Sequence, residues 1–180
     1  MGCFLDCAGL GPELEKAGLL QPCPEQPDAQ RRRPADVYVP SWKNGFPAAF
    51  DLAITSPHRR DVLTEAANKI GHVAESYEHY KRQYLNTAAD CQSQGIAFIP
   101  IIGKPAGGWG PSAVCTFKNI ARNIAFQTGR EAGDILREHR QTMSIAVRRH
   151  HARAIFRRLP ADAALTNTAE AAALAALAAD

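Results

Sequence analysis

Two aspartates, Asp36 and Asp51, combine a residue type and a spacing from which chemistry can be predicted. Fourteen residues separate them, and the segment between them is predicted to form a β-hairpin, because Asn44-Gly45 is a strong signal for a two-residue turn. Side chains alternate along a strand, so both carboxylates are expected on one face. Diagonal neighbours on such a face lie roughly 7–8 Å apart between Cα atoms, close enough to share one divalent cation. The alternative is a pair of solvated aspartates on an exposed face.

The register of the hairpin follows from placing Asn44-Gly45 at its turn. Residue 36 then lies opposite residue 53, and residue 37 lies opposite residue 52. The side chains separate onto two faces under this register. One face collects Val37, Val39, Phe50, Leu52 and Ile54, and the other collects Asp36, Tyr38, Asp51 and Ala53.

A long amphipathic helix, predicted from about residue 59 to residue 93, contributes a third group, Lys81. It lies four residues after Tyr77 and three before Tyr84, so it belongs to the inward stripe of the helix. Because burying an unpaired ammonium is costly, Lys81 requires an anionic partner, and the acidic face of the hairpin offers one. The alternative is a lysine that extends along the helix into solvent.

Two aspartates and a lysine are the set needed for metal-assisted hydrolysis of a phosphodiester. Asp36 and Asp51 would hold Mg²⁺ or Mn²⁺, hard cations that take oxygen ligands. Such a cation generates a hydroxide-like nucleophile, and Lys81 would orient the water or stabilise the developing negative charge. Glu13 or Glu15, on a short helix predicted near the N-terminus, is a candidate for a further carboxylate.

The other elements complete a single α/β domain over residues 1–159. In chain order, the pattern predicts a short helix around 12–16 that stops at Gly18, a loop at 22–33, the hairpin at about 35–56, the helix at about 59–93, a buried apolar strand at 96–102, and two C-terminal helices at about 112–128 and 131–159. Pro100 in the apolar strand requires a position where no ladder N–H is needed. Residues 160–180 are alanine-rich, and we expect them to form a mobile tail.

The distribution of charge is more informative than its sum, which is only +3. Arg31, Arg32 and Arg33 directly precede the Asp36 strand, and the last predicted helix carries a larger group that includes Arg148, Arg149 and Arg153. Clustered arginines are typical of a surface that binds a phosphate backbone. The sequence therefore predicts DNA as a partner, with a solvated basic helix face as the alternative.

The five cysteines contain no CxxC pair and are odd in number, so we interpret them as reduced thiols of an intracellular protein, nuclear or cytoplasmic. No segment approaches the length of a transmembrane span or of a signal-peptide core. We therefore expect no membrane association.

Three segments together resemble the PD-(D/E)XK nuclease superfamily. They are Arg33-Pro34-Ala35-Asp36, Asp51-Leu52-Ala53-Ile54-Thr55-Ser56 and Tyr80-Lys81-Arg82-Gln83-Tyr84. More closely, the chain resembles the C-terminal restriction-like endonuclease domain of non-LTR retrotransposon polyproteins, in which a basic residue, Pro and Asp are followed by a second carboxylate and by a lysine on the next helix. The segments 11–20, 107–111 and 152–158 also resemble regions that flank this domain, so the resemblance covers about residues 9–159.

The resemblance implies a restriction-endonuclease-like core of helix, β-hairpin, long helix and buried strand, followed by two C-terminal helices. It also implies a metal-dependent DNA nickase in which Asp36 and Asp51 bind the metal and Lys81 is catalytic, with Tyr84 and Glu15 in support. The chain departs from the common pattern in two places: Ala35 separates Pro34 from Asp36, and Ala53 stands where the lysine usually lies. The alternatives are an inactive nucleic-acid-binding remnant of the same fold and a module that binds a partner through the Tyr77/Tyr84 stripe.

Overall fold

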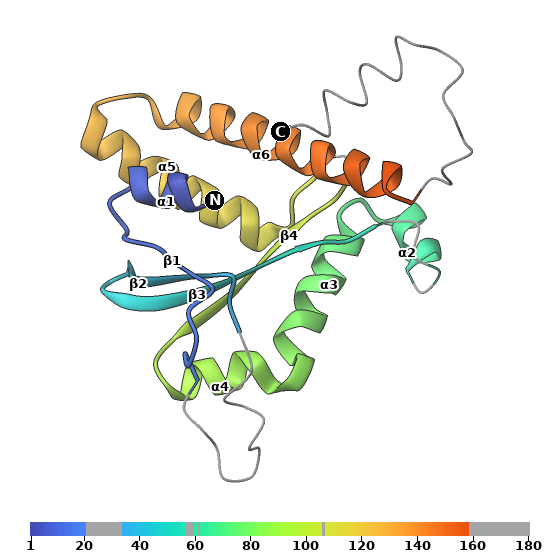
Figure 1. Ribbon diagram of the computed structural model, residues 1–180, viewed down its shortest axis with the longest axis horizontal. Helices are drawn as coiled ribbons and strands as arrows, with labels where there is room; N and C mark the ends of the chain where they lie inside the picture. The colour runs from blue at the N-terminus through green and yellow to red at the C-terminus, as the bar shows by residue number, and fades with distance from the viewer. Residues whose placement is uncertain (21–33, 57–59, 61, 106, 159–180) are drawn as a thin grey trace.

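The computed structural model describes residues 1–20, 34–56, 60, 62–105 and 107–158, and these form an α/β fold around a four-stranded mixed sheet (Figure 1). The strand order is β1-β2-β3-β4, with antiparallel pairing up to β3 and parallel pairing between β3 and β4. The strands are β1 (Glu13–Leu14), β2 (Val37–Lys43), β3 (Phe46–Ile54) and β4 (Ala97–Gly103). The helices are α1 (Gly2–Cys7), α2 (Leu63–Asn68), α3 (His72–Gln83), the 3-10 turn η2 (Tyr84–Asn86), α4 (Thr87–Ser93), α5 (Pro111–Thr128) and α6 (Ala132–Phe156).

The predicted hairpin is present, with a different register beyond its turn. Lys43 pairs with Phe46 across Asn44-Gly45, as predicted, and both turn residues have positive φ. An irregularity between Val39 and Lys43 then shifts the pairing by two residues, so that Val37 lies opposite Phe50 rather than residue 52. A shift of two residues keeps every side chain on its predicted face, because the side-chain period of a strand is also two.

The two faces of the sheet are covered by different helices (Figure 1). On one face, β2, β3 and β4 pack against α1, α5 and the start of α6, in a core that contains Val39, Phe50, Ile101, Phe117 and Ile135. On the other face, a smaller cluster packs against α4. It contains Leu19, Leu20, Ala35, Ala49, Cys91 and Ile96. The sheet is therefore buried on both sides, as expected for a strand that runs parallel to its neighbour.

The single long helix predicted for residues 59–93 is wrong, because two backbone breaks divide it. Gly71 has φ 90° and separates α2 from α3, and Leu85 and Asn86 have φ 52° and 55° and separate α3 from α4. These conformations stop the helical hydrogen-bond pattern, and they turn α4 so that Cys91 is buried against the sheet. The apolar period placed Tyr84 on the inward stripe, but this side chain is 51% exposed, and the period carried no signal for the kink at residues 85 and 86.

The helix predicted at residues 12–16 is also wrong. Glu13–Leu14 form the edge strand β1, paired with β2, and Glu15 has φ 45°, which is incompatible with a helix. A helix this short has few internal hydrogen bonds to offset the cost of nucleation. Pairing with β2 therefore determines the conformation of this segment. The N-terminal helix lies earlier, at α1, where Leu5 is buried in the core.

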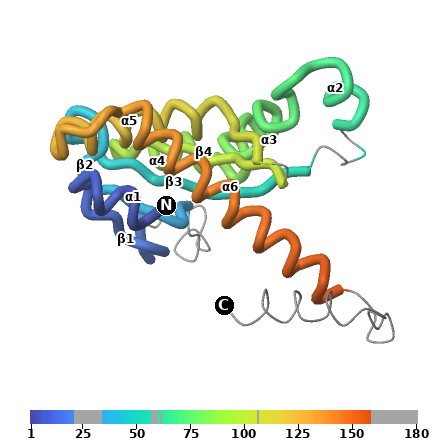
Figure 2. The backbone as a smooth tube through the Cα atoms, turned by 90° about the horizontal axis from the view of Figure 1, so that it is seen from above, coloured from blue at the N-terminus to red at the C-terminus, as the bar shows by residue number. Residues whose placement is uncertain are grey.

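The buried strand and the two C-terminal helices are confirmed. Pro100 lies on β4, which is the edge strand beside β3. An edge strand tolerates proline because one side of it has no neighbouring strand that needs an N–H donor. α5 ends at Gly129, whose φ is 70°, and α6 follows at once. Figure 2 shows that the C-terminal half of α6 extends away from the rest of the fold, and its buried residues, Ile135 and His139, both lie in its first half. The predicted tail at 160–180 lies outside the described residues.

A buried carboxylate, Glu78, joins α3 to the start of α5. Its side chain is 4% exposed. Ser112 donates its backbone N–H to Glu78 Oε1 at 3.0 Å and its hydroxyl to Oε2 at 2.7 Å, and Arg82 Nη2 lies 3.5 Å from Oε2. A carboxylate at this position satisfies an N–H group in the first turn of α5 and complements the helix dipole.

Gly110, directly before α5, leaves the space that this carboxylate occupies. A Cβ atom at Gly110 would overlap Glu78 Oε1, whereas Gly110 has an ordinary backbone conformation with φ −70°. We expect Gly110→Ala to lower the free energy of unfolding by about 1–3 kcal/mol, because the new methyl group displaces a buried carboxylate. Urea denaturation measures the change.

Gly133→Ala is the matched control, since a Cβ at this helical glycine meets nothing within 4 Å. It should raise the stability by about 0.5 kcal/mol through its higher helix propensity. Equal effects of the two substitutions would contradict the steric account of Gly110.

His139 of α6 is packed between two phenylalanine rings. Its ring stacks on Phe4 with centroids 3.4 Å apart and meets Phe117 edge-on at 4.9 Å. Its Nε2 atom is buried without a hydrogen-bond partner. Burial, together with the positive charge of the Met1 amino group, lowers the pKa of His139 to about 4.

The pKa of His139 implies a loss of stability in acid. The unfolded histidine takes up a proton near pH 6.5 and the folded one only near pH 4, so stability falls as the pH drops through this interval. We expect His139→Phe to reduce the loss between pH 7 and pH 4.5 by about 2 kcal/mol, measured by urea denaturation at both values. His150→Gln, an exposed position on the same helix, is the control and should leave the loss unchanged. An unchanged loss in His139→Phe would mean that this ring does not set the acid sensitivity.

Candidate functional site

Asp51 and Lys81 form an ion pair between the sheet and α3. Lys81 Nζ lies 2.8 Å from Asp51 Oδ2, and the side chains are 24% and 16% exposed for Lys81 and Asp51. Asp51 lies in the middle of β3, and its side chain points to the face that α3 covers. The inward stripe of α3 brings Lys81 to the same face, as predicted, so the lysine does not extend into solvent.

Asp36 lies beside this pair, at the start of β2. Its Oδ2 atom accepts the backbone N–H of Leu52 at 2.6 Å, and its own N–H donates to the Phe50 carbonyl at 2.9 Å. Since Leu52 directly follows Asp51, this bond fixes the Asp36 carboxylate next to Asp51. The register shift also contributes, because extending the pairing of Val37 with Phe50 places residue 36 opposite residue 51, not residue 53.

The charges of the three side chains influence one another. Burial raises the pKa of the Asp51 carboxyl, and the charge of Asp36 adds to the rise, while the hydrogen bond from Lys81 opposes it without cancelling it. Burial opposes the charge of Lys81, but the hydrogen bond and the negative charge of Asp51 outweigh it and raise the pKa of Lys81. Lys81 is therefore an ammonium at neutral pH.

A small pocket of about 220 Å³ opens over the ion pair. Asp51 and Lys81 are the charged residues that line it. The other lining residues are Pro34, Tyr84, Leu85, Thr87 and Phe98. The pocket thus gives a small anionic group, such as a phosphate, access to the lysine and to the carboxylate.

The donor set fits a hard cation that keeps most of its water. In the described part of the chain, no group of three or more His, Cys, Asp and Glu side chains is arranged to hold a metal. Mg²⁺ needs only one or two carboxylates when waters and substrate phosphate complete its shell. Asp36 and Asp51 each use one oxygen in the contacts above, and the second oxygen of each carboxylate is the group that would ligate the cation.

Two supporting residues predicted from the sequence lie at the edge of this arrangement. Tyr84 lines the pocket and is 51% exposed. Glu15 has an exposed side chain, and its backbone N–H donates to the Asp36 carbonyl at 2.9 Å, so it helps to position the strand that carries Asp36.

Glu78 is a site-supporting residue that the sequence reasoning missed. It lies three residues before Lys81 on the inward stripe of α3 and holds this helix against α5. A glutamate on an otherwise inward helical stripe is a signal that can be found by the same argument that identified Lys81.

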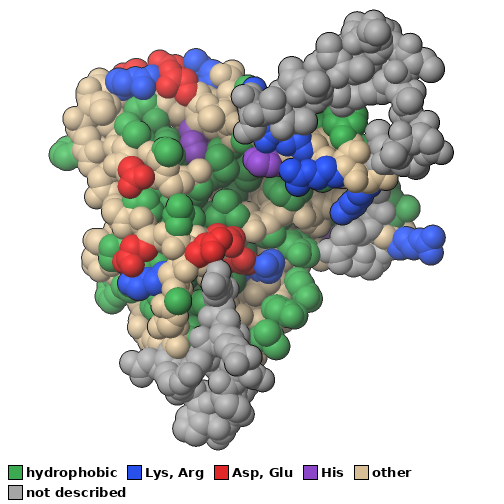
Figure 3. Space-filling model, viewed as in Figure 1, with side chains coloured by type: hydrophobic (Ala, Val, Ile, Leu, Met, Phe, Trp, Pro, Cys, Tyr) green, Lys and Arg blue, Asp and Glu red, His purple; other side chains and the backbone are tan. Residues whose placement is uncertain are grey.

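The predicted DNA-contacting arginines are divided between two places. Arg31, Arg32 and Arg33 lie outside the described residues. Arg148, Arg149 and Arg153 lie on the protruding half of α6, where Figure 3 shows a group of basic side chains. Arg149 and Arg153 line a shallow groove of about 460 Å³ on α6, and the Arg148 guanidinium lies next to Gly107, in the loop that follows β4.

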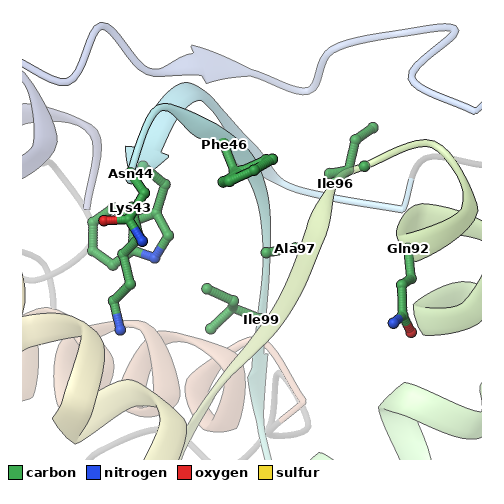
Figure 4. A pocket seen from close by; sticks show the side chains of 9 residues that line it. Lys43, Asn44, Phe46, Gln92, Ile96, Ala97 and Ile99 are labelled. Atoms are coloured by element: carbon green, nitrogen blue, oxygen red, sulfur yellow. The ribbon is translucent and has the colours of Figure 1, made fainter.

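A larger pocket, of about 510 Å³, lies away from the aspartates at the tip of the hairpin. Figure 4 shows Phe46, Ala97, Ile96 and Ile99 around it, with Gln92 of α4 at its edge. Lys43 is the one charged residue among those that line this pocket. Its other lining residues are apolar or carry neutral amides, so the pocket has no carboxylate to hold a cation.

Comparison with known proteins leaves the function to be argued from this geometry. No protein-family model matches the chain, and neither the curated proteins nor the solved structures contain a significant match. Across the described residues, no helix is long and apolar enough to cross a membrane.

The Asp51–Lys81 pair should contribute more to stability than an exposed pair of similar length. In a double-mutant cycle of Asp51→Asn and Lys81→Met, we expect a coupling of about 1–2 kcal/mol, because each single change leaves a largely buried polar partner. The control cycle is Arg130→Met with Glu138→Gln, whose ion pair of 2.6 Å joins side chains that are 51% and 60% exposed. Its coupling should stay below about 1 kcal/mol. Equal couplings from urea denaturation would show that burial does not strengthen the Asp51–Lys81 contact.

Proposed function

We propose that this chain is a metal-dependent DNA endonuclease domain that nicks phosphodiester bonds. The observation that carries the proposal is the ion pair of Asp51 and Lys81, which lines a pocket of about 220 Å³ and has Asp36 directly beside it. An ammonium and a carboxylate that line one pocket, with a second carboxylate beside them, are groups that metal-assisted phosphodiester hydrolysis uses.

Asp36 and Asp51 hold Mg²⁺ or Mn²⁺ in this proposal. The bound cation supplies a water of lowered pKa and neutralises charge on the scissile phosphate. Asp51 must lose its proton to bind the cation, and its raised pKa means that acid competes with the metal at higher pH than for a free aspartate.

Lys81 acts as a charge stabiliser and not as a base. Its raised pKa keeps it protonated, so it donates hydrogen bonds to the phosphate oxygens as negative charge develops on them. Tyr84 lines the same pocket and would contact the same phosphate in this proposal. Glu15 supports the site through its backbone bond to Asp36.

The fold of this domain, in the same proposal, is the restriction-endonuclease-like core of non-LTR retrotransposon polyproteins. The order of a hairpin bearing two aspartates, a helix bearing the lysine, and a strand parallel to β3 supports this assignment. The arginines of α6 would bind the DNA backbone through its phosphates, so the affinity should fall steeply with salt.

A second candidate function is an inactive nucleic-acid-binding remnant of the same fold. The observation that favours it is the lack of a third carboxylate or imidazole at the aspartates, within the part of the chain that the structure describes. The remnant would keep the salt-sensitive binding and lose cleavage.

Nicking of supercoiled plasmid with Mg²⁺ or Mn²⁺ tests the proposal. We expect the wild type to nick the plasmid, and Asp51→Asn and Lys81→Met each to lower the rate at least about 100-fold, because each removes a group that contacts the metal or the developing charge. EDTA should abolish the reaction.

Asp134→Asn is the matched control, because it removes an aspartate that also forms an ion pair, with Arg137 at 3.0 Å, on α6. It should nick as the wild type does. Equal nicking by wild type and Asp51→Asn would indicate a contaminating nuclease. No nicking by the wild type, with salt-sensitive DNA retardation on a gel, would establish the inactive remnant.

A further inference from the structure

Three tyrosines, two in α3 and one directly after it, form a continuous ladder of rings. Tyr77 and Tyr80 have ring centroids 5.6 Å apart, and Tyr80 and Tyr84 have centroids 5.4 Å apart, with interplanar angles of 31° and 40°. Their spacing of three and four residues places them on one side of the helix. The ladder runs along the same helix as Lys81 and ends at its last turn.

The last two rings of this ladder are turned toward solvent. Tyr80 is 49% exposed and Tyr84 is 51% exposed, whereas the buried stripe of α3 consists of Val73, Ala74 and Glu78. The core therefore does not need these two rings. Large exposed aromatic surface that is contiguous is characteristic of a binding face.

The ladder is continuous with the pocket that contains the ion pair. Tyr84 and the next residue, Leu85, line that pocket together with Asp51 and Lys81. Leu85 is 55% exposed and has φ 52°, a left-handed conformation that is unfavourable for a non-glycine residue. Because the kink at Leu85 ends α3, the following turn does not cover Tyr84, and the last ring of the ladder stays open at the mouth of the pocket.

We propose that the Tyr80–Tyr84 face is a stacking platform for unpaired nucleobases of the strand whose phosphate enters the pocket. This inference rests on the proposed endonuclease function and defines its substrate class as single-stranded or locally opened nucleic acid. Every base has a π-face, so stacking on aromatic rings holds a strand without reading its sequence. Bases in a closed duplex already stack on one another, so they reach the rings only after the duplex opens.

The test is binding without catalysis. In EDTA, wild type and Tyr80→Leu are titrated into a short oligonucleotide containing 2-aminopurine, as a single strand and as a duplex of the same sequence. We expect the wild type to bind the single strand more tightly and to change its fluorescence, and Tyr80→Leu to weaken that binding about fivefold or more. Tyr80→Phe keeps the ring and should restore the wild-type affinity. The matched control is Phe126→Leu, an aromatic residue on α5 that is 93% exposed, which should leave the affinity unchanged.

The outcomes separate this inference from the endonuclease proposal. Nicking by the wild type together with equal binding by Tyr80→Leu would overturn the platform and leave the endonuclease intact. Loss of single-strand binding in Tyr80→Leu, without nicking by any variant, would support the platform and overturn the catalysis. If light scattering shows that the wild type is a dimer and Tyr80→Leu a monomer, with single-strand binding equal in both, the ladder is a protein interface and the inference is wrong.

Discussion

The position of α3 depends on one buried carboxylate. Glu78 accepts both the N–H and the hydroxyl of Ser112 at the start of α5, and Arg82 closes the same network from the next turn of α3. A buried carboxylate is costly unless it is fully hydrogen-bonded, so this network holds α3 and α5 in one relative position. Lys81 lies one turn from Glu78, and its reach to Asp51 follows from where that network holds the helix. Gly110 supports the arrangement by leaving room for the carboxylate.

A second constraint acts within the sheet. The irregularity in β2 moves the pairing by two residues and brings Asp36 from a diagonal position to one beside Asp51. The Asp36 carboxylate then accepts the hydrogen bond of the Leu52 N–H group. Elsewhere in a sheet, a backbone carbonyl of the neighbouring strand accepts such a bond. The same carboxylate therefore completes the pairing of β3 and adds negative charge next to Asp51. Both effects follow from the register of β2, which sets Asp36 opposite Asp51.

The left-handed conformations of Leu85 and Asn86 separate α3 from α4 and give the two helices different directions. Upstream, α3 presents Lys81 to the sheet and its tyrosines to solvent. Downstream, α4 turns to bury Cys91 beside Ile96 and Ala49. Strain in a non-glycine residue persists only where the surrounding structure enforces it, and here one of the two strained residues, Leu85, lines the candidate site.

Local patterns in the sequence determined most of the elements and the faces of this protein. Asn44-Gly45 predicted the turn, alternation predicted which hairpin residues face the core, the helical period placed Lys81 inward, and Gly129 marked the end of α5, because each depends on the geometry of neighbouring residues. The bulge in β2, the kink at Leu85, the strand at Glu13–Leu14 and the contact of Glu78 with Ser112 arise only in the tertiary structure. In each of these, a partner distant in sequence offsets a local cost: backbone strain, a broken ladder or a buried charge. The ion pair of Asp51 and Lys81 depends on both the local pattern and the tertiary structure. The helical period determines the face of α3 on which Lys81 lies, and the packing of α3 determines the distance between the two side chains.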